Sequence, residues 1–398
     1  MPYTQGATDC TPNEVGYDES RIPILNNHLQ KLIDENVIFG TTYCASRRGK
    51  VFLHGALGYK TYRKDDSLPL SPGDIRYIAS MTKTFTGVAI MKLVEDGIVC
   101  LDETVGSILP QFSTPPFDKI NLFHLLTHTS GMHPDGNCFE NKHNLSQWEL
   151  MHRAYKLHKR SDGELDWIAA GLSNGVRDVP GKQWMYCSFG FVILGVVIEK
   201  LTGIHPHKFI EDSICKPLGM ADTAFDLTPE MAKRYMIDSG EWGEKHINAI
   251  LSGEEAPDED EDFWKRIPQT GGGLNSTVAD VIRYGNMMLN GGTLGGVRVL
   301  GRKAVEKMTT MAIHNTPDFC WGANTPARGY GIGFDMRNGV QFTFSDGTFM
   351  HEGAGACAMY VDPKEELVVT WIVPYMEGVD WSPRAMYNTL NIICSGLK

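Results

Sequence analysis

The sequence lacks the patterns of a disulfide-stapled, zinc-clustered or membrane-spanning protein. Its nine cysteines are scattered over 398 residues without a C-x-x-C pair, which argues against a disulfide framework and against a zinc cluster. The longest apolar stretch, residues 189–198, is interrupted by glycines and is too short to cross a bilayer. The N-terminal residues contain neither a basic region nor an apolar core, so no secretory signal is predicted. We therefore expect free thiols, a cytoplasmic location and no membrane partner.

Basic residues are in the minority. The 37 lysines and arginines against 48 aspartates and glutamates leave a net charge of −11, which repels phosphate backbones, so no nucleic-acid partner is expected. Seven acidic side chains fall within residues 254–262, a run typical of a solvated loop. With 42% hydrophobic and 21% charged residues the composition is that of a folded protein, and the length predicts about two or three domains.

Motifs for nucleotides and metals are missing as well. The sequence contains no G-x-x-x-x-G-K, no G-x-G-x-x-G and no H-E-x-x-H. His124 and His128 are spaced like two zinc ligands, but no third ligand lies nearby, so we interpret them as structural residues. We expect neither a cofactor nor a metal.

Helical and strand-like patterns follow one another in an order that predicts two domains. Helical spacing of apolar residues occurs at 19–36, from Ser80 to Gly97, at 191–202, at 277–290 and from about 383. Strand-like runs occur at 41–46, 50–55, 341–345, 356–361 and 367–373, the first two forming a hairpin. Because strands lie toward both ends of the chain, we predict an α/β sheet domain from residues 1–75 and 295–398, with an all-helical domain, 76–294, inserted between its halves.

The G-x-S-x-G motif of α/β-hydrolases has one literal match, at residues 171–175. That motif requires a helix to leave the serine, so that the hydroxyl is held at the helix N-terminus. Pro180 and Gly181 follow where such a helix would run. We interpret this match as chance.

A serine and a lysine three residues later lie on one face of a helix, close enough to share a proton. This S-x-x-K spacing occurs at Ser80–Lys83, Ser213–Lys216 and Ser395–Lys398. The last pair is at the end of the sequence, where fraying disfavours a site, and Pro217 makes Lys216 a helix end whose dipole opposes an alkoxide. Ser80 instead opens a helical pattern after a strand-like run at 75–78, so it is our candidate nucleophile.

The segment Ile78-Ala-Ser-Met-Thr-Lys-Thr-Phe85 resembles the active-site motif of the class C β-lactamase and penicillin-binding-protein-like serine hydrolases. Further segments resemble blocks of this family in the same order: Leu125–Gly131, Pro180–Ser188, Pro217–Met220, Gly271–Thr277 and His351–Gly353. The resemblance extends from about residue 15 to the C-terminus. It implies a β-lactamase/DD-peptidase-like fold, with an antiparallel sheet flanked by helices and a helical domain inserted.

The family's second motif, Y-x-N or Y-x-S, has two candidates in the chain. Tyr284-Gly-Asn286 lies inside a helical run, where a tyrosine is more simply a packing residue, whereas Tyr186-Cys-Ser188 follows Pro-Gly-x-x-Trp as in the family. We therefore choose Tyr186. For the third motif, K-x-G or H-x-G, the one match is His351-Glu-Gly353, which lies between two strand patterns as an edge strand beside the site would.

The resemblance also implies roles for these residues. Ser80 is the acylated nucleophile, and Lys83 and Tyr186 together supply its base, with the choice between them left open. The backbone N–H groups of Ser80 and Ala354 form the oxyanion hole, and Gly353 and Gly355 suit a close backbone approach. His351 orients Tyr186 or the substrate and titrates near neutrality, so activity is expected to fall in acid.

Two departures from the β-lactamase branch bear on the substrate. Ser188 replaces an asparagine that contacts the substrate's side-chain amide, and His351 replaces a lysine that binds a carboxylate. Both changes resemble the family VIII-type esterase and D-aminopeptidase relatives. We therefore expect hydrolysis of small-molecule carboxylic esters through a Ser80 acyl-enzyme. The alternatives are an acyltransferase or transesterase using the same intermediate, and a D-amino-acid amidase or peptidase with weak β-lactamase activity on an amide substrate.

Two further observations leave alternatives open. The aromatic-rich segment from Met132 to Asp178, between the first two motifs, is equally consistent with a lid over an apolar pocket and with a plain scaffold insertion. A non-catalytic binding module that kept the fold is disfavoured, because Ser80, Lys83, Tyr186 and His351 are all intact.

Overall fold

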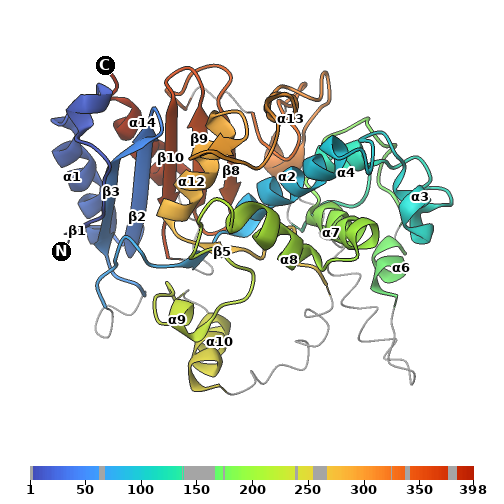
Figure 1. Cartoon of the computed structure of the whole chain (residues 1–398), viewed down its shortest axis with the longest axis horizontal. Helices are drawn as coiled ribbons and strands as arrows, with labels where there is room; N and C mark the ends of the chain where they lie inside the picture. Colours follow the sequence, from blue (N-terminus) through green and yellow to red (C-terminus); the bar gives the residue numbers. More distant parts are fainter. Residues whose placement is uncertain are drawn as a thin grey trace.

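Six strands from the two ends of the chain form one antiparallel sheet in the computed structural model (Figure 1). The spatial order is β1-β3-β2-β10-β9-β8. The strands are β1 (Tyr3–Gln5), β2 (Gly40–Arg47), β3 (Lys50–Gly58), β8 (Phe349–Gly353), β9 (Cys357–Asp362) and β10 (Leu367–Ile372). The structure describes residues 3–61, 68–136, 138, 166–173, 175–237, 241–253, 267–323, 325–336, 341–374 and 383–398.

The two halves of the sheet meet where β2 pairs with β10, with Ala45 opposite Val369. The predicted hairpin is confirmed, because Arg47 pairs with Lys50 across a tight turn. In that turn Arg48 and Gly49 both have a positive φ, as the two central residues of a two-residue hairpin loop must when its twist matches that of the strands. The chain ends are therefore joined by long-range pairing, with β8 at one edge of the sheet.

Helices cover both faces of this sheet. The helices α1 (Arg21–Asp34) and α14 (Pro383–Cys394) pack against each other on one face, and α12 (Val278–Leu289) packs on the other against β2, β9 and β10 (Figure 1). Successive side chains of β9 enter different cores: Ala358 and Tyr360 join the α1 side, while Met359 and Val361 join the α12 side. Such alternation in a fully buried strand places a hydrophobic layer on each face.

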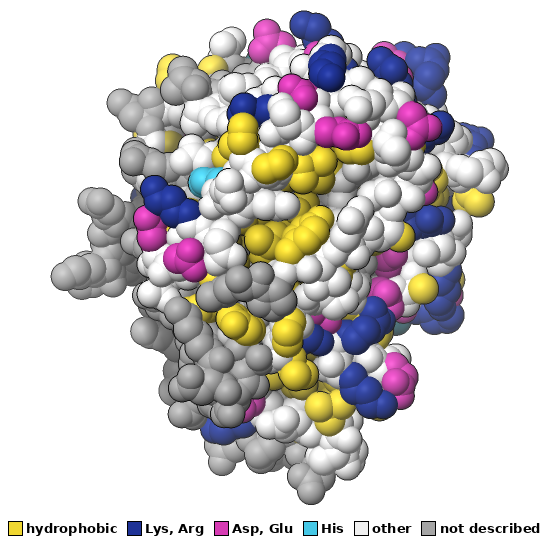
Figure 2. All heavy atoms as spheres, turned by 90° about the vertical axis from the view of Figure 1, so that its left-hand side faces the viewer, with side chains coloured by type: hydrophobic (Ala, Val, Ile, Leu, Met, Phe, Trp, Pro, Cys, Tyr) yellow, Lys and Arg dark blue, Asp and Glu magenta, His cyan; other side chains and the backbone are white. Residues whose placement is uncertain are grey.

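The outer face of the α1–α14 layer is shown in Figure 2. Hydrophobic side chains gather near its centre, and basic and acidic side chains lie around them. Ile24 of α1 is one of the exposed large hydrophobic residues of the chain.

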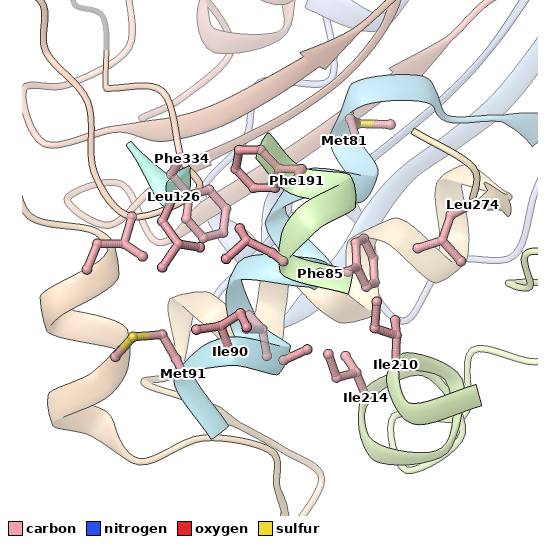
Figure 3. Packing of buried hydrophobic residues seen from close by; sticks show 14 of the residues in the cluster. Met81, Phe85, Ile90, Met91, Leu126, Phe191, Ile210, Ile214, Leu274 and Phe334 are labelled. Atoms are coloured by element: carbon pink, nitrogen blue, oxygen red, sulfur yellow. The ribbon is translucent and has the colours of Figure 1, made fainter. Parts of the chain in front are cut away.

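Helix α2 (Thr82–Glu95) is buried along nearly its whole length, and helix α7 (Ser188–Thr202) packs against it. Phe85 and Ile90 of α2 lie in one core with Phe191 of α7 and with Ile210 and Ile214 (Figure 3). The other helices are α3 (Val105–Ile108), α4 (Leu122–Leu126), α6 (Trp167–Leu172), α8 (Pro206–Ile210), α9 (Pro229–Ala232), α10 (Glu241–Ser252) and α13 (Arg302–Met308).

Short elements complete the described chain. The turns of 3-10 helix are η1 (Pro12–Val15), η2 (Ala79–Met81), η3 (Pro110–Phe112) and η5 (Cys320–Gly322), and η4 (Glu211–Cys215) is a π-helical turn. Two small strand pairs join β4 (Arg76–Tyr77) to β5 (Asn275–Ser276) and β6 (Thr293–Leu294) to β7 (Val297–Arg298). The β4–β5 pair joins the segment before Ser80 to the segment after Gly271.

One strand prediction was wrong. Residues 341–345 alternate like a strand, but they form no ladder pairing in the sheet. The aromatic rings of Phe342 and Phe344 pack on Tyr360 of β9, and the backbone N–H of Thr343 donates to the side-chain oxygen of Asn391 in α14 at 3.0 Å. A side chain of α14 thus takes the hydrogen bond that a neighbouring strand would have made.

All nine cysteines are free thiols. No single helix in the described ranges is long and apolar enough to cross a membrane, although the bent pair formed by α7 and the segment Pro206–Cys215 is so by length and composition. The acidic run at 254–262 and most of the segment from Met132 to Asp178 lie outside the described residues. The division into domains at 75/76 and 294/295 stays a prediction.

Candidate active site

Ser80 lies in the turn η2, immediately before the long buried helix α2. The preceding residue, Ala79, has a φ of 46°, which is unusual for a residue with a side chain. Strain of this kind persists only where the surrounding structure enforces it. The turn places the Ser80 hydroxyl at the positive end of the α2 dipole, as predicted from the helical pattern.

Lys83 lies one turn further along and is fully buried. Its Nζ donates a hydrogen bond to Ser80 Oγ at 3.0 Å and another to the carbonyl oxygen of Gly271 at 2.6 Å. Burial lowers the pKa of Lys83 to about 8, against the opposing effect of the Asp135 carboxylate. A neutral amine in this position can still donate to Gly271 while its lone pair accepts the proton of Ser80.

The Gly271 carbonyl is held in place by the helices on either side of it. Thr86 Oγ1 on α2 donates to the carbonyl of Thr270 at 2.7 Å, and Thr270 Oγ1 donates to the carbonyl of Phe191 on α7 at 2.8 Å. Both hydroxyls are buried, where polar groups need a hydrogen-bond partner, so these two bonds hold the backbone at residue 270 in place. The acceptor for Lys83 is therefore a fixed part of the scaffold.

Tyr186 lies directly beside Lys83, whose Nζ is 4.8 Å from the centre of the tyrosine ring. Burial raises the pKa of Tyr186 well above its usual value, and a hydrogen bond with Ser80 acts in the opposite direction. The ring packs on His128 with centroids 4.4 Å apart and on Trp321 at 5.2 Å. The structure thus brings Ser80, Lys83 and Tyr186 together and leaves the phenol protonated near neutrality.

Ser188 begins helix α7 and contacts a carboxylate that the sequence analysis missed. Asp135 accepts the backbone N–H of Ser188 at 2.7 Å and the Ser188 hydroxyl at 2.5 Å. Asp135 stands in the irregular stretch between the first two motifs, with no spacing pattern that marks it. Only the folded chain reveals it as part of the site.

The segment from His351 to Ala354 closes the site from the sheet side. His351 and Gly353 lie in β8, at the edge of the sheet as predicted, and β8 contacts the turn η2 that carries Ser80. The Ala354 carbonyl accepts a hydrogen bond from the buried Arg76 at 2.8 Å. Nδ1 of His351 lies 2.6 Å from the carbonyl oxygen of Glu352, so this nitrogen carries a hydrogen and donates it.

Gly353 is required by the close approach of β8 to the nucleophile turn. A Cβ at this position would lie 2.4 Å from Cys357 Sγ and 2.5 Å from the carbonyl oxygen of Ile78. That carbonyl also accepts the Cys357 thiol at 3.2 Å. Any side chain at position 353 would therefore push the end of β8 away from the turn that holds Ser80.

We expect Gly353→Ala to lower kcat by about 10²-fold or more, because one donor of an oxyanion hole contributes about that much. The effect should appear in kcat for an activated ester while binding of a product acid is little changed. Gly73→Ala is the matched control, since its Cβ would meet only Arg234 Nη1 at an ordinary 3.6 Å. Equal activities of the two variants would contradict this reading of Gly353.

The competing candidates lie elsewhere. The half-buried Ser213 donates to the carbonyl of Phe209, and the exposed Lys216 pairs with Asp212. Tyr284 is buried and stacked on Phe85, 3.9 Å between ring centroids, which confirms it as a packing residue.

The other sequence matches also have structural roles. Ser173 follows the short helix α6 and donates back to Ala170, so it forms no nucleophile elbow. His128 accepts the N–H of Cys187 at 3.0 Å, and His124 contributes to the cap of α4. Within the described ranges no three His, Cys, Asp or Glu side chains are grouped to hold a metal ion.

Comparison with known proteins shows the family to which the chain belongs. A family model described as Beta-lactamase matches residues 25–388. Penicillin-binding protein 4* of Bacillus subtilis (strain 168) is 30% identical over 265 residues, which cover 65% of this chain and 54% of that protein. The chain therefore matches only about half the length of that relative.

Solved structures agree on the fold. EstCE1, described as a hydrolase with promiscuous acyltransferase activity, superposes with a TM-score of 0.72 at 19% identity, covering 96% of this chain and 99% of that one. A family VIII carboxylesterase gives a TM-score of 0.70 at 15% identity, covering 99% and 100%. Identities this low establish the fold alone, which confirms the predicted antiparallel sheet with flanking helices. From the match over residues 25–388, the chain belongs to the beta-lactamase family, whose members are serine hydrolases.

Proposed function

We propose that this protein hydrolyses small carboxylic esters through an acyl-enzyme on Ser80. The observation that carries the proposal is the buried Lys83 amine, 3.0 Å from Ser80 Oγ, with its pKa lowered to about 8. A serine hydroxyl is a weak nucleophile unless a base takes its proton. A lysine with a pKa near the working pH meets that requirement.

Between the two candidate bases, the structure favours Lys83. Its pKa is lowered by burial, whereas the pKa of Tyr186 is raised by burial, so near neutrality the amine loses its proton more readily than the phenol. We therefore assign Lys83 as acceptor of the Ser80 proton and Tyr186 as the hydroxyl that passes a proton to the leaving alcohol. His351 is proposed to orient Tyr186 or the substrate.

The reaction then follows from these positions. Ser80 Oγ bonds to the ester carbonyl carbon as its proton passes to Lys83, and the negative carbonyl oxygen is stabilised by the N–H groups of Ser80 and Ala354. The C–O bond to the alcohol breaks as the alcohol takes the proton of Tyr186, and Lys83 then passes its proton to the Tyr186 phenolate, which leaves the amine neutral. The Lys83 amine takes a proton from water as the water oxygen bonds to the acyl carbon. The C–O bond to Ser80 breaks as Ser80 Oγ takes that proton back, and the acid is released.

Esters are favoured over amides by the chemistry around Ser188. Its hydroxyl donates to Asp135, so it does not replace the asparagine amide that binds an acylamide in the β-lactamase branch. An alcohol also leaves more readily than an amine and needs less help from a general acid. The carboxylesterase and EstCE1 likenesses in fold are consistent with this choice.

Acyl transfer is the second candidate, because a second alcohol can replace water at deacylation without any change in the groups described. The fold likeness to EstCE1, with its promiscuous acyltransferase activity, supports including it. A D-amino-acid amidase or peptidase is the third, supported by the penicillin-binding relative.

One experiment separates these activities. The purified protein is incubated with p-nitrophenyl esters of short acids, a chromogenic cephalosporin and D-amino-acid anilides, each with and without a primary alcohol. We expect rapid cleavage of the esters and an acyl adduct on Ser80 by mass spectrometry. Formation of a new ester with the added alcohol would assign acyl transfer. Cleavage of the cephalosporin or the anilides alone would overturn the ester proposal.

A further inference from the structure

The Asp135 carboxylate is bound to the site through both polar groups of Ser188. One oxygen accepts the Ser188 N–H at 2.7 Å and the other accepts the Ser188 hydroxyl at 2.5 Å. Two hydrogen bonds from one residue to one carboxylate fix both the rotamer of the serine and the start of α7. Among the described residues Asp135 makes no ion pair within 4 Å, so no salt-bridge partner offsets the effect of its negative charge on the site residues.

Several titratable groups surround this carboxylate. These groups are Lys83 on α2, Tyr186 and Cys187 in the segment just before α7, and Cys138, whose N–H donates to the Asp135 carbonyl. Burial raises the pKa of Asp135, while the Lys83 ammonium and the two hydrogen bonds from Ser188 act to keep it ionised. Tyr330 also acts on Tyr186, and Lys83, His351 and Arg328 act on His128, which packs on the Tyr186 ring.

We propose, on the basis of the function proposed above, that Asp135 is a positioning residue that fixes Ser188 and whose negative charge sets the pH range in which Ser80 is activated. The charge favours the protonated forms of both Lys83 and Tyr186. It thereby holds Lys83 as an ammonium until the pH rises, and it keeps the phenol of Tyr186 able to donate.

The direction of the effect does not depend on which group is the base. Asp135 raises the pKa of Lys83 and also raises the pKa of Tyr186. The base must be deprotonated to accept the Ser80 proton, so activity is lost as the pH falls below its pKa. Removing the charge of Asp135 lowers both pKa values, and the acidic limb of the profile moves to lower pH in either case.

The test compares Asp135→Asn with the wild type by the pH dependence of kcat/KM for p-nitrophenyl acetate. We expect the acidic limb to move down by about one pH unit, the size of shift that a nearby opposite charge produces. Asp135→Glu keeps the charge and should keep the wild-type limb even where kcat falls. Ser188→Ala removes one hydrogen bond and keeps the charge, so it should lower kcat without moving the limb by as much.

The same comparison is made on the phosphonylation of Ser80 by an alkyl fluorophosphonate, in which the serine oxygen bonds to phosphorus and displaces fluoride. The adduct is measured by mass spectrometry over the same pH range. This reaction needs no turnover, so a failure of ester hydrolysis would count against the proposed function, while the pH dependence of phosphonylation would still test Asp135. An unmoved limb in Asp135→Asn would overturn the proposal. If Asp135→Asn does not fold, Asp135→Glu tests the proposal instead. An acidic limb at the wild-type pH in Asp135→Glu would support the proposal. A limb that moves down by about one pH unit although the charge is kept would overturn it.

Discussion

Ser80→Ala is expected to abolish ester hydrolysis, with a fall in kcat of about 10³-fold or more. Without the hydroxyl no acyl-enzyme forms, and the remaining groups can only polarise the carbonyl toward water. The hydroxyl is small and half-buried, so the fold should be unaffected. Initial rates with p-nitrophenyl acetate and the mass of the protein after reaction with a fluorophosphonate measure the loss.

Ser213→Ala is the matched control, since Ser213 opens the second S-x-x-K match but donates only to the carbonyl of Phe209. We expect this variant to keep wild-type activity and to form the adduct. Activity retained in Ser80→Ala, or lost in Ser213→Ala, would show that the nucleophile lies elsewhere.

Lys83→Met is expected to lower kcat by about 10²- to 10⁴-fold, the contribution of a positioned general base. In the wild type, kcat/KM should rise with pH through about 8, because the amine accepts a proton only in its neutral form and its pKa is lowered to that value. The methionine variant should lose this limb. Rates measured between pH 5.5 and 9.5 test both statements.

The same substitution is expected not to lower the unfolding temperature. A buried amine is costly, and methionine replaces it with an apolar chain of similar length. Lys216→Met, on the surface beside Asp212, should leave the activity and its pH profile unchanged. A Lys83→Met protein that unfolds well below the wild type would mean that lost activity reports on stability. In that case the pH profile of Lys83→Arg separates loss of the base from loss of stability, because arginine keeps a positive charge but cannot lose its proton in this pH range.

The contrast between these two pairs shows why the local pattern was informative. Ser80 and Lys83 are three residues apart at the start of a helix, so helix geometry places them on one face, where they make a hydrogen bond. Ser213 and Lys216 have the same spacing, yet Lys216 turns to Asp212 four residues back. The motif therefore predicted a contact, and its place before the buried helix α2 predicted which copy forms a site.

Other parts of the site could not be read from spacing. The Gly271 carbonyl reaches Lys83 because two buried threonines hold its segment against α2 and α7. Asp135 reaches Ser188 across 53 residues, from a stretch with no periodicity. Contacts of this kind depend on how helices pack, and a single chain gives no local signal for them.

The strand prediction at 341–345 failed for a related reason. The alternating Phe342 and Phe344 both pack against the core, but the pattern does not state what the backbone pairs with. Asn391 of α14 accepts the N–H of Thr343, so the segment packs as a strand would without joining the sheet. A strand in a sheet needs both alternating side chains and backbone hydrogen bonds to a neighbouring strand, and only the alternation is visible in the sequence.

The motifs that the sequence lacks, together with the few that it contains, predicted a serine hydrolase. Absent metal, nucleotide and disulfide motifs left serine chemistry, and the helical start at Ser80 selected the candidate nucleophile, because both depend on residues close together in the chain. The tertiary structure decided the rest. The tertiary fold places Gly353 against Ile78, buries Lys83 and thereby lowers its pKa, and brings Asp135 into contact with Ser188. Each of these depends on the packing of segments that are distant in the sequence and that exclude water from the site.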